Sequence, residues 1–152
     1  MTFREKKRAQ LEWLHSLEPK KPGEWLIVMG HWPVYSFRGN GPTKELANVL
    51  AWMRNVKADA YLCGHDHALQ HIIGGDALDP VFLASGAGGY PLHFSLKDDG
   101  ESGFNQEGNA QLKHSQDENG FMSMQVFRER LFVSFMDMNG TETYRMSLNR
   151  RT

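Results

Sequence analysis

Apolar residues recur at helical spacing in two segments of the first half of the chain. In residues 3–17 they recur about every three to four positions, which predicts an amphipathic helix. The stretch 19–23 holds two prolines and a glycine, which end this helix. Residues 43–56 repeat the helical pattern, and Thr43 is the expected N-cap of this second helix.

Each predicted helix is followed by a short, continuous apolar run. These runs are residues 25–29, WLIVM, and residues 58–63, ADAYLC. Continuous apolar runs of this length are typical of strands buried on both faces, in a sheet that helices cover. Helix and strand therefore alternate, which predicts an α/β fold, and the helix between the two strands implies that they run parallel.

Beyond residue 64 the pattern changes to short strands and long polar stretches. Residues 69–73 and 80–85 predict two strands joined by a turn. Residues 86–120 are rich in Gly, Asp, Asn and Gln, so we expect a long functional or mobile loop there. The remaining residues form three strand-like runs, joined at Glu129 and at the turn 139–140.

Composition indicates a globular domain and excludes two kinds of partner. The chain has 152 residues, 40% of them hydrophobic and 23% charged, which is enough for one domain with a real core. Its net charge of −1 offers no basic field, so we expect neither nucleic acid nor an anionic membrane as a partner. The longest apolar run, 25–29, is too short to span a bilayer. With a single cysteine, Cys63, the chain cannot form an internal disulfide.

Histidines follow both of the predicted buried strands. The first strand leads into Gly30 and His31, and the second into Gly64, His65 and, two positions on, His67. The carboxyl ends of parallel strands meet at one edge of a sheet, where α/β proteins bind ligands, so we expect the histidines to lie together. On extended backbone His65 and His67 would point to the same side, about 7 Å apart at Cα. That spacing suits one metal ion or one ligand for each of two.

A single histidine after a strand is usually an ordinary surface or core residue, and an H-x-H pair alone is a weak signal. The combination of G-H-x-P-V after one strand and C-G-H-D-H after the next is much more specific. It favours a metal site at His31, His65 and His67. The other histidines are interpreted as structural or surface residues: His15, His71, His93 and His114. Of these, His114 lies in the predicted loop and could reach a substrate.

The segments WLIVMGHWPVYSFRGNGPT, AYLCGHDHALQHI and FLASGAGG resemble the C-terminal half of the metallophosphoesterases, in particular the purple, tartrate-resistant acid phosphatases. This resemblance implies an α/β four-layer sandwich of two mixed sheets between helices, with a dinuclear metal centre at the strand ends. By the resemblance, His31 and His65 bind the divalent metal and His67 binds the ferric ion, and iron pairs with iron, zinc or manganese. The implied reaction is hydrolysis of a phosphomonoester by a metal-bound hydroxide.

The carboxylate motifs of that family precede the first strand of the pattern and are not found in this chain. The GDALD at 75–79 imitates one of them, but it lies after His67 between two predicted strands, where it is ordinary turn chemistry. Three imidazoles without a bridging carboxylate would hold at most one divalent ion, weakly. We therefore expect residues 1–152 to be a single partial domain, inactive alone, that associates with an N-terminal half or with itself.

Asn40 is the expected catalytic residue outside the metal ligands. By the resemblance, it occupies the position of a histidine that contacts the phosphate or protonates the leaving group. Asparagine can donate a hydrogen bond but cannot deliver a proton at a useful pKa. We therefore expect even a completed enzyme to be slow on esters with poor leaving groups.

Two other functions stay open at this point. One is a non-catalytic scaffold or binding protein on the same fold, although the intact His31, His65 and His67 argue against it. The other is a mononuclear zinc hydrolase formed by this chain alone. It lacks an evident carboxylate, because extended backbone would turn Asp66 away from its histidine neighbours. The compartment is not fixed by the residues, and the resemblance implies a secretory, lysosomal or extracellular one.

Overall fold

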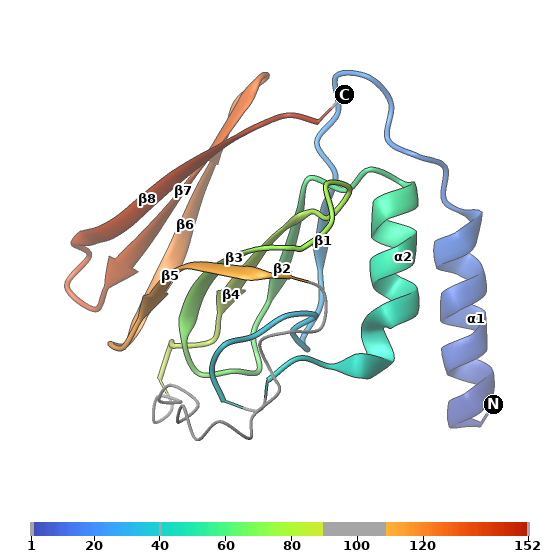
Figure 1. Cartoon of the computed structure of the whole chain (residues 1–152), viewed down its shortest axis with the longest axis horizontal. Helices are drawn as coiled ribbons and strands as arrows, with labels where there is room; N and C mark the ends of the chain where they lie inside the picture. The colour runs from blue at the N-terminus through green and yellow to red at the C-terminus, as the bar shows by residue number, and fades with distance from the viewer. Residues whose placement is uncertain (1, 40, 90–108, 152) are drawn as a thin grey trace.

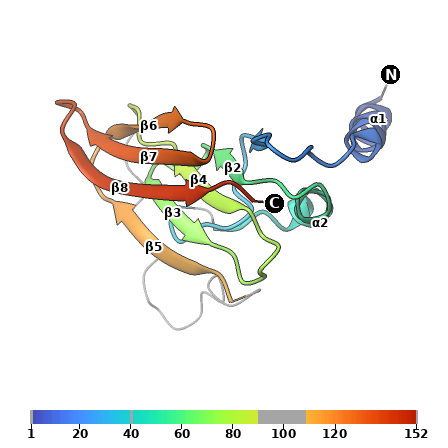
Figure 2. The ribbon, with the colours of Figure 1, turned by 90° about the horizontal axis from the view of Figure 1, so that it is seen from above.

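The computed structural model describes residues 2–39, 41–89 and 109–151. A five-stranded sheet lies between a layer of helices and a three-stranded sheet (Figures 1 and 2), so the described residues hold three layers of the predicted four-layer sandwich. The elements are α1 (Phe3–Ser16), β1 (Ile27–Met29), the 3₁₀ helix η1 (Lys44–Leu46), α2 (Ala47–Asn55), β2 (Ala60–Cys63), β3 (Leu69–Ile73), β4 (Val81–Ser85), β5 (Gln111–Gln116), β6 (Gly120–Val126), β7 (Arg130–Asp137) and β8 (Glu142–Asn149).

The larger sheet is mixed, with strand order β1-β2-β4-β3-β5. β1, β2 and β4 run parallel, so the parallel arrangement predicted for the first two strands is confirmed. β3 is antiparallel to both β4 and β5. The smaller sheet is an antiparallel meander, β6-β7-β8, which confirms the three strand-like runs predicted after residue 120.

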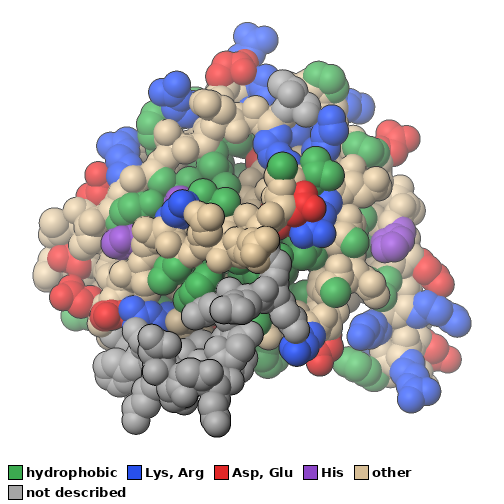
Figure 3. All heavy atoms as spheres, in the orientation of Figure 1, with side chains coloured by type: hydrophobic (Ala, Val, Ile, Leu, Met, Phe, Trp, Pro, Cys, Tyr) green, Lys and Arg blue, Asp and Glu red, His purple; other side chains and the backbone are tan. Residues whose placement is uncertain are grey.

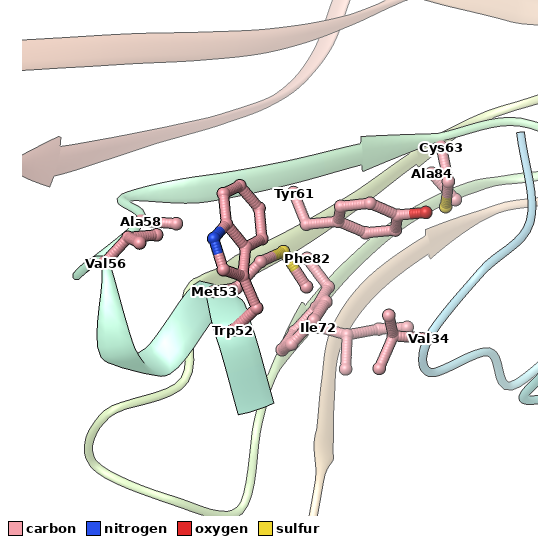
Figure 4. Close-up of a cluster of buried hydrophobic side chains, with 10 residues drawn as sticks. All are labelled: Val34, Trp52, Met53, Val56, Ala58, Tyr61, Cys63, Ile72, Phe82 and Ala84. Atoms are coloured by element: carbon pink, nitrogen blue, oxygen red, sulfur yellow. The ribbon is translucent and has the colours of Figure 1, made fainter. Parts of the chain in front are cut away.

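Two cores hold the layers together, one on each face of the larger sheet. Figure 4 shows the core on the helical face, where Trp52 and Met53 of α2 lie over Tyr61 and Phe82. Neighbouring strand residues point to the opposite face, because side chains alternate along a strand. There they meet the smaller sheet in the second core, whose buried residues are Leu69, Leu83, Ala87, Leu131, Val133 and Phe135.

The first strand is shorter and more exposed than the sequence predicts. β1 covers only residues 27–29 of the predicted 25–29, and the side chain of Met29 is 77% exposed. β1 is the edge strand of its sheet, and β2 is its one partner in the described part of the chain. Val28 and Ile27 are partly buried against the cores on opposite faces, so the prediction of burial on both faces holds in part and fails at Met29.

The two helices form where they were predicted, but their packing and ends differ from expectation. A capping box of Thr2 and Glu5 begins α1, yet no residue of this helix is buried and Phe3 is 82% exposed. Only its residue Leu14 reaches the core beneath α2, and charged side chains cover α1 (Figure 3). Thr43 begins η1 rather than an α-helix, and its side chain makes no capping hydrogen bond.

The predicted loop over residues 86–120 is wrong in part, because it contains β5 and the start of β6. β5 has a single large apolar residue, Leu112, which is 38% exposed, so hydrophobicity carries little strand signal. Pairing with β3 creates the strand instead, with an irregularity in register between His71 and Ile72. Residues 90–108 of the predicted loop lie outside the described residues.

The C-terminal residues tie the end of the meander to the base of the larger sheet. The backbone N–H of Arg151 donates to Asp59, whose carboxylate also forms a buried ion pair with Lys20 at 2.6 Å. The Arg151 guanidinium donates to four backbone carbonyls, at 3.0 to 3.1 Å. These carbonyls belong to Ala58, Ala77, Leu78 and Asp79.

Candidate metal centre

β1 and β2 end at the same edge of the larger sheet, and each continues into a glycine. The N–H of Gly30 donates to the carbonyl of Leu62 at 2.9 Å, and the N–H of Gly64 donates to the carbonyl of His31 at 3.1 Å. The pairing of the two strands therefore continues past their ends. It carries His31 and His65 to the same place, one from each strand.

The two imidazole rings approach each other closely. Nε2 of His31 and Nδ1 of His65 are 3.3 Å apart, and the ring centroids are 5.2 Å apart. Zinc binds imidazole nitrogens at about 2.0–2.1 Å, so two nitrogens on one tetrahedral ion lie about 3.3–3.4 Å apart. The separation of these two atoms fits a shared metal ion.

The backbone around His65 and His67 differs from the one that the sequence argument assumed. That argument needed extended backbone, whereas His65 has a φ of +59°, in the left-handed region, and residues 65–68 form a bend. Asp66 is fully buried at this bend, while His65 and His67 are partly exposed. In the part of the chain that the structure describes, no group of three His, Cys, Asp or Glu side chains converges. His31, His65 and His67 therefore do not form a three-ligand metal site in the described residues.

The end of β4 supports the bend that carries these histidines. The N–H of Gly86 donates to the carbonyl of Ala68 at 3.1 Å. A Cβ at Gly86 would overlap the backbone oxygen of Asp66, so only glycine fits at this position without displacing the bend. The start of the segment after β4 is thus a packing support for the bend.

An aromatic side chain that the sequence argument did not single out lies beside the histidine pair. The Trp32 ring centroid is 3.7 Å from that of His65, and the indole is 49% exposed. The hydroxyl of Tyr61 donates to the Trp32 carbonyl at 2.7 Å. Burial raises the pKa of Tyr61 to about 12, so this hydroxyl keeps its proton and remains a donor. A Cβ at Gly30 would overlap the same hydroxyl, which explains the glycine before His31.

The loop after Trp32 is held by a buried glutamine on β3. Gln70 accepts a hydrogen bond from the N–H of Phe37 at 2.8 Å and donates to the hydroxyl of Ser36 at 2.9 Å. A buried polar group is costly unless it is hydrogen-bonded, and here both ends of the amide are satisfied. A glutamine inside the apolar run LQHII is the sequence signal that could have identified this role.

Arg38 fixes the same loop to β5 just before the predicted catalytic position. Its Nε donates to Ser115 at 2.9 Å, and its guanidinium forms an ion pair with Asp117. Asn40 itself lies outside the described residues, so its predicted contact with the phosphate stays a prediction.

The remaining histidines do not join the pair in the described residues. His71 is buried on β3 and its Nδ1 lies 2.8 Å from the hydroxyl of Tyr144, which agrees with a structural role. His114 lies in β5 rather than in a loop, and its ring stacks on Tyr144. His15 is exposed on α1, and His93 lies outside the described residues.

Comparison with known proteins identifies the relatives of this arrangement. The family model of the calcineurin-like phosphoesterases matches residues 1–69, the range that holds His31, His65 and His67. The chain is 30% identical over 149 residues to tartrate-resistant acid phosphatase type 5 of Sus scrofa, a match that covers 95% of the chain and 42% of that protein. The chain is thus similar to the calcineurin-like phosphoesterases over the residues that carry its histidines. It is also 34% identical over 129 residues to purple acid phosphatase 4 of Arabidopsis thaliana, covering 80% of the chain and 34% of that protein.

Solved structures agree with this assignment at the level of the fold. The purple acid phosphatase PPD1 of yellow lupin superposes with a TM-score of 0.71 at 17% identity, over 96% of this chain and 28% of that one. GAP50, the anchor in the inner membrane complex of Plasmodium, gives 0.65 at 19% identity, over 84% of this chain and 37% of that one. The α/β metallophosphoesterase fold is confirmed. The chain spans less than half the length of the curated relatives named above.

None of the helices in the described residues is long and apolar enough to cross a membrane.

Proposed function

We propose that this chain supplies the histidine half of the dinuclear metal centre of an acid phosphatase-like enzyme that hydrolyses phosphomonoesters. The observation that carries this proposal is the 3.3 Å separation of His31 Nε2 and His65 Nδ1, within the two glycine-histidine motifs at the sheet edge. The relatives of the chain are acid phosphatases, which supports a phosphate ester as the substrate.

In this proposal His31 and His65 hold one divalent ion, and His67 holds the iron of the pair. In the described residues no third His, Cys, Asp or Glu side chain joins the His31–His65 pair, which agrees with a second ion at His67 rather than a shared one. When bound, the metal ions would polarise a phosphoryl oxygen and lower the pKa of a water molecule. Iron, zinc and manganese are the candidates for the divalent position, since imidazole binds each of them.

The remaining residues of the site act by positioning. Gly86 leaves room for the backbone around His65 to turn, and Tyr61 fixes the backbone that links His31 to Trp32. The imidazoles must lose their protons before they bind a metal, so the affinity of the pair for metal decreases in acid. Asn40, at the end of the loop that Gln70 and Arg38 hold, would donate a hydrogen bond to the phosphate.

The described residues hold two convergent imidazoles, without a bridging carboxylate. We therefore propose that residues 1–152 are a partial domain, that alone they bind at most one divalent ion weakly, and that turnover needs a further half of the site. The missing carboxylates would come from an N-terminal half.

Strand edges that are open in the described residues support that partner. β1 and β6 are edge strands, and unpaired edges invite pairing with another segment. Large apolar side chains are exposed at or beside both: Met29 on β1, and Phe121, Val126 and Phe127 along and after β6. An N-terminal half would cover these edges and bring its ligands to the sheet edge at His31.

The test combines metal binding with turnover. Equilibrium dialysis against Zn²⁺ should show at most one ion for each chain, lost in His31→Ala and His65→Ala and kept in His15→Ala, an exposed control on α1. The chain alone should hydrolyse para-nitrophenyl phosphate poorly. Robust turnover by this chain would overturn the half-site proposal. Zinc binding that is unchanged in both site variants would favour the scaffold alternative.

The partner proposal has its own measurement. In sedimentation analysis at high concentration the chain should self-associate through its open edges, because no N-terminal half is present to cover them. A clean monomer at high concentration would contradict the assignment of these edges as a docking surface. Charged substitutions at Phe121 and Val126 should weaken the association, whereas a charge at the already exposed Trp13 on α1 should not.

A further inference from the structure

Two histidines that the metal centre does not use face each other across β3 and β5. His71 and His114 are partners in the register of these antiparallel strands. Both contact Tyr144 on β8, which lies across this part of the larger sheet (Figure 2). The hydroxyl of Tyr144 is 2.8 Å from Nδ1 of His71, and its ring stacks on His114 with centroids 4.0 Å apart and planes inclined by 2°. One side chain of the smaller sheet thus binds two imidazoles of the larger sheet.

The surroundings of both imidazoles suit only their neutral forms. His71 is 6% exposed, and the Nε2 atoms of His71 and His114 are buried without a hydrogen-bond partner in the described residues. A neutral imidazole has one N–H, whereas a charged one has two. Protonation would therefore place a charge and a second N–H where no acceptor is present. The ring of Phe135 also lies beside His114, with the ring centroids 5.6 Å apart, and this apolar neighbour offers no acceptor.

Burial and the charges around the cluster also favour the neutral imidazoles. Burial, then the positive Lys113, then His114 lower the pKa of His71 to about 4. Burial also lowers the pKa of His114 and raises that of Tyr144. β3, β4 and β6 carry no further titratable group. The charged residues of β7 and β8 do not contribute to the pKa of His71: Arg130, Asp137, Glu142 and Arg145.

We propose that His71, His114 and Tyr144 form an acid-sensitive contact between the two sheets. The contact holds the smaller sheet on the larger one while both imidazoles are neutral, and it opens when they take up protons. This inference does not depend on the proposed phosphatase activity, because none of the three residues belongs to the metal centre.

The direction of the pH dependence follows from proton linkage. His71 has a lower pKa in the folded chain than in the unfolded chain, so its contribution to stability is complete above about pH 6.5 and decreases as the pH falls towards 4. With a folded pKa of about 4, the unfolding equilibrium constant should rise roughly 50- to 100-fold between pH 7.5 and pH 4.5 through His71 alone.

Urea unfolding at pH 7.5 and pH 4.5 tests the proposal on the whole chain. His71→Gln keeps a polar group beside Tyr144 but does not titrate, so this variant should lose most of the additional acid sensitivity. His114→Gln should lose part of it, and His15→Gln, the exposed control on α1, should behave as the wild type. A wild-type pH dependence in both cluster variants would overturn the proposal.

Two measurements on the wild-type chain keep the proposal testable if a variant does not fold. NMR titration of the histidine ring protons should show His71 neutral at pH 6, and a His71 resonance that titrates near pH 6.5 would contradict the proposal. Amide exchange at pH 5 should show protection lost in β7 and β8 before β2 and β4. Protection lost from all four strands together would contradict an opening between the sheets.

Discussion

Gly86→Ala should disturb the histidine bend without changing any polar group. Gly86 follows β4, and its N–H donates to Ala68 in the bend. The added Cβ would overlap the backbone oxygen of Asp66, and a backbone atom cannot move aside as the end of a flexible side chain can. Gly86 is not in the left-handed region, so the backbone conformation itself tolerates alanine and the expected effect is purely steric.

The structure offers a matched control for this substitution. Gly88 lies two residues further on, and a Cβ there would meet no atom within 4 Å. Overpacking a tight site costs about 1–3 kcal/mol of folding free energy. Gly→Ala at an open position raises stability by about 0.4–1 kcal/mol, because it restricts the unfolded chain. This gain is common to both variants and cancels between them, so Gly86→Ala should be about 1–3 kcal/mol less stable than Gly88→Ala.

Urea unfolding of the two variants measures this difference, and zinc dialysis measures its effect on the site. Gly86→Ala should also weaken zinc binding, because the bend sets the position of His65 relative to His31. Gly88→Ala should bind zinc as the wild type does. Equal stability and equal zinc affinity of the two variants would refute the view that β4 supports the histidine bend by close packing.

Three further predictions concern the frame around the site. Arg151→Ala should lower the free energy of unfolding by about 2–4 kcal/mol, because four carbonyls lose a charged donor. The control Arg128→Ala, at an exposed side chain, should have little effect on denaturant unfolding. Tyr61→Phe should cost about 1 kcal/mol and change the tryptophan emission spectrum, since it frees the backbone of Trp32. Cys63 is buried, so a thiol reagent should label it only at the rate of unfolding, and immediate labelling of the native chain would contradict its burial.

The convergence of His31 and His65 could be predicted from the sequence because it depends on two local signals and one general rule. The apolar runs before the glycines identify the strands, and the intervening helix makes them parallel. Parallel neighbours end at the same edge of a sheet, so the residues that follow them meet there. No contact distant in the chain was needed for this inference.

The bend at His65 and the strand β5 could not be predicted in this way. His65, in left-handed backbone, belongs to a bend that packs against Gly86, the residue after β4. An argument from the spacing of extended residues cannot foresee this contact between distant parts of the chain. β5 has one large apolar residue, Leu112, and its pairing with β3 rather than its own hydrophobicity makes it a strand. The contact of Trp32 with His65 is likewise a tertiary contact, and no periodic pattern in the sequence announces it.

The central claim is that His31 and His65 share one divalent metal ion through particular ring nitrogens. NMR of the ¹⁵N-labelled imidazoles during a Zn²⁺ titration tests it directly, because metal binding shifts the resonance of the coordinating nitrogen. The structure predicts that Nε2 of His31 and Nδ1 of His65 shift together, at the same zinc concentration, while His15 does not respond. Shifts at only one of the two rings, or at the opposite nitrogen of either ring, would contradict the shared site.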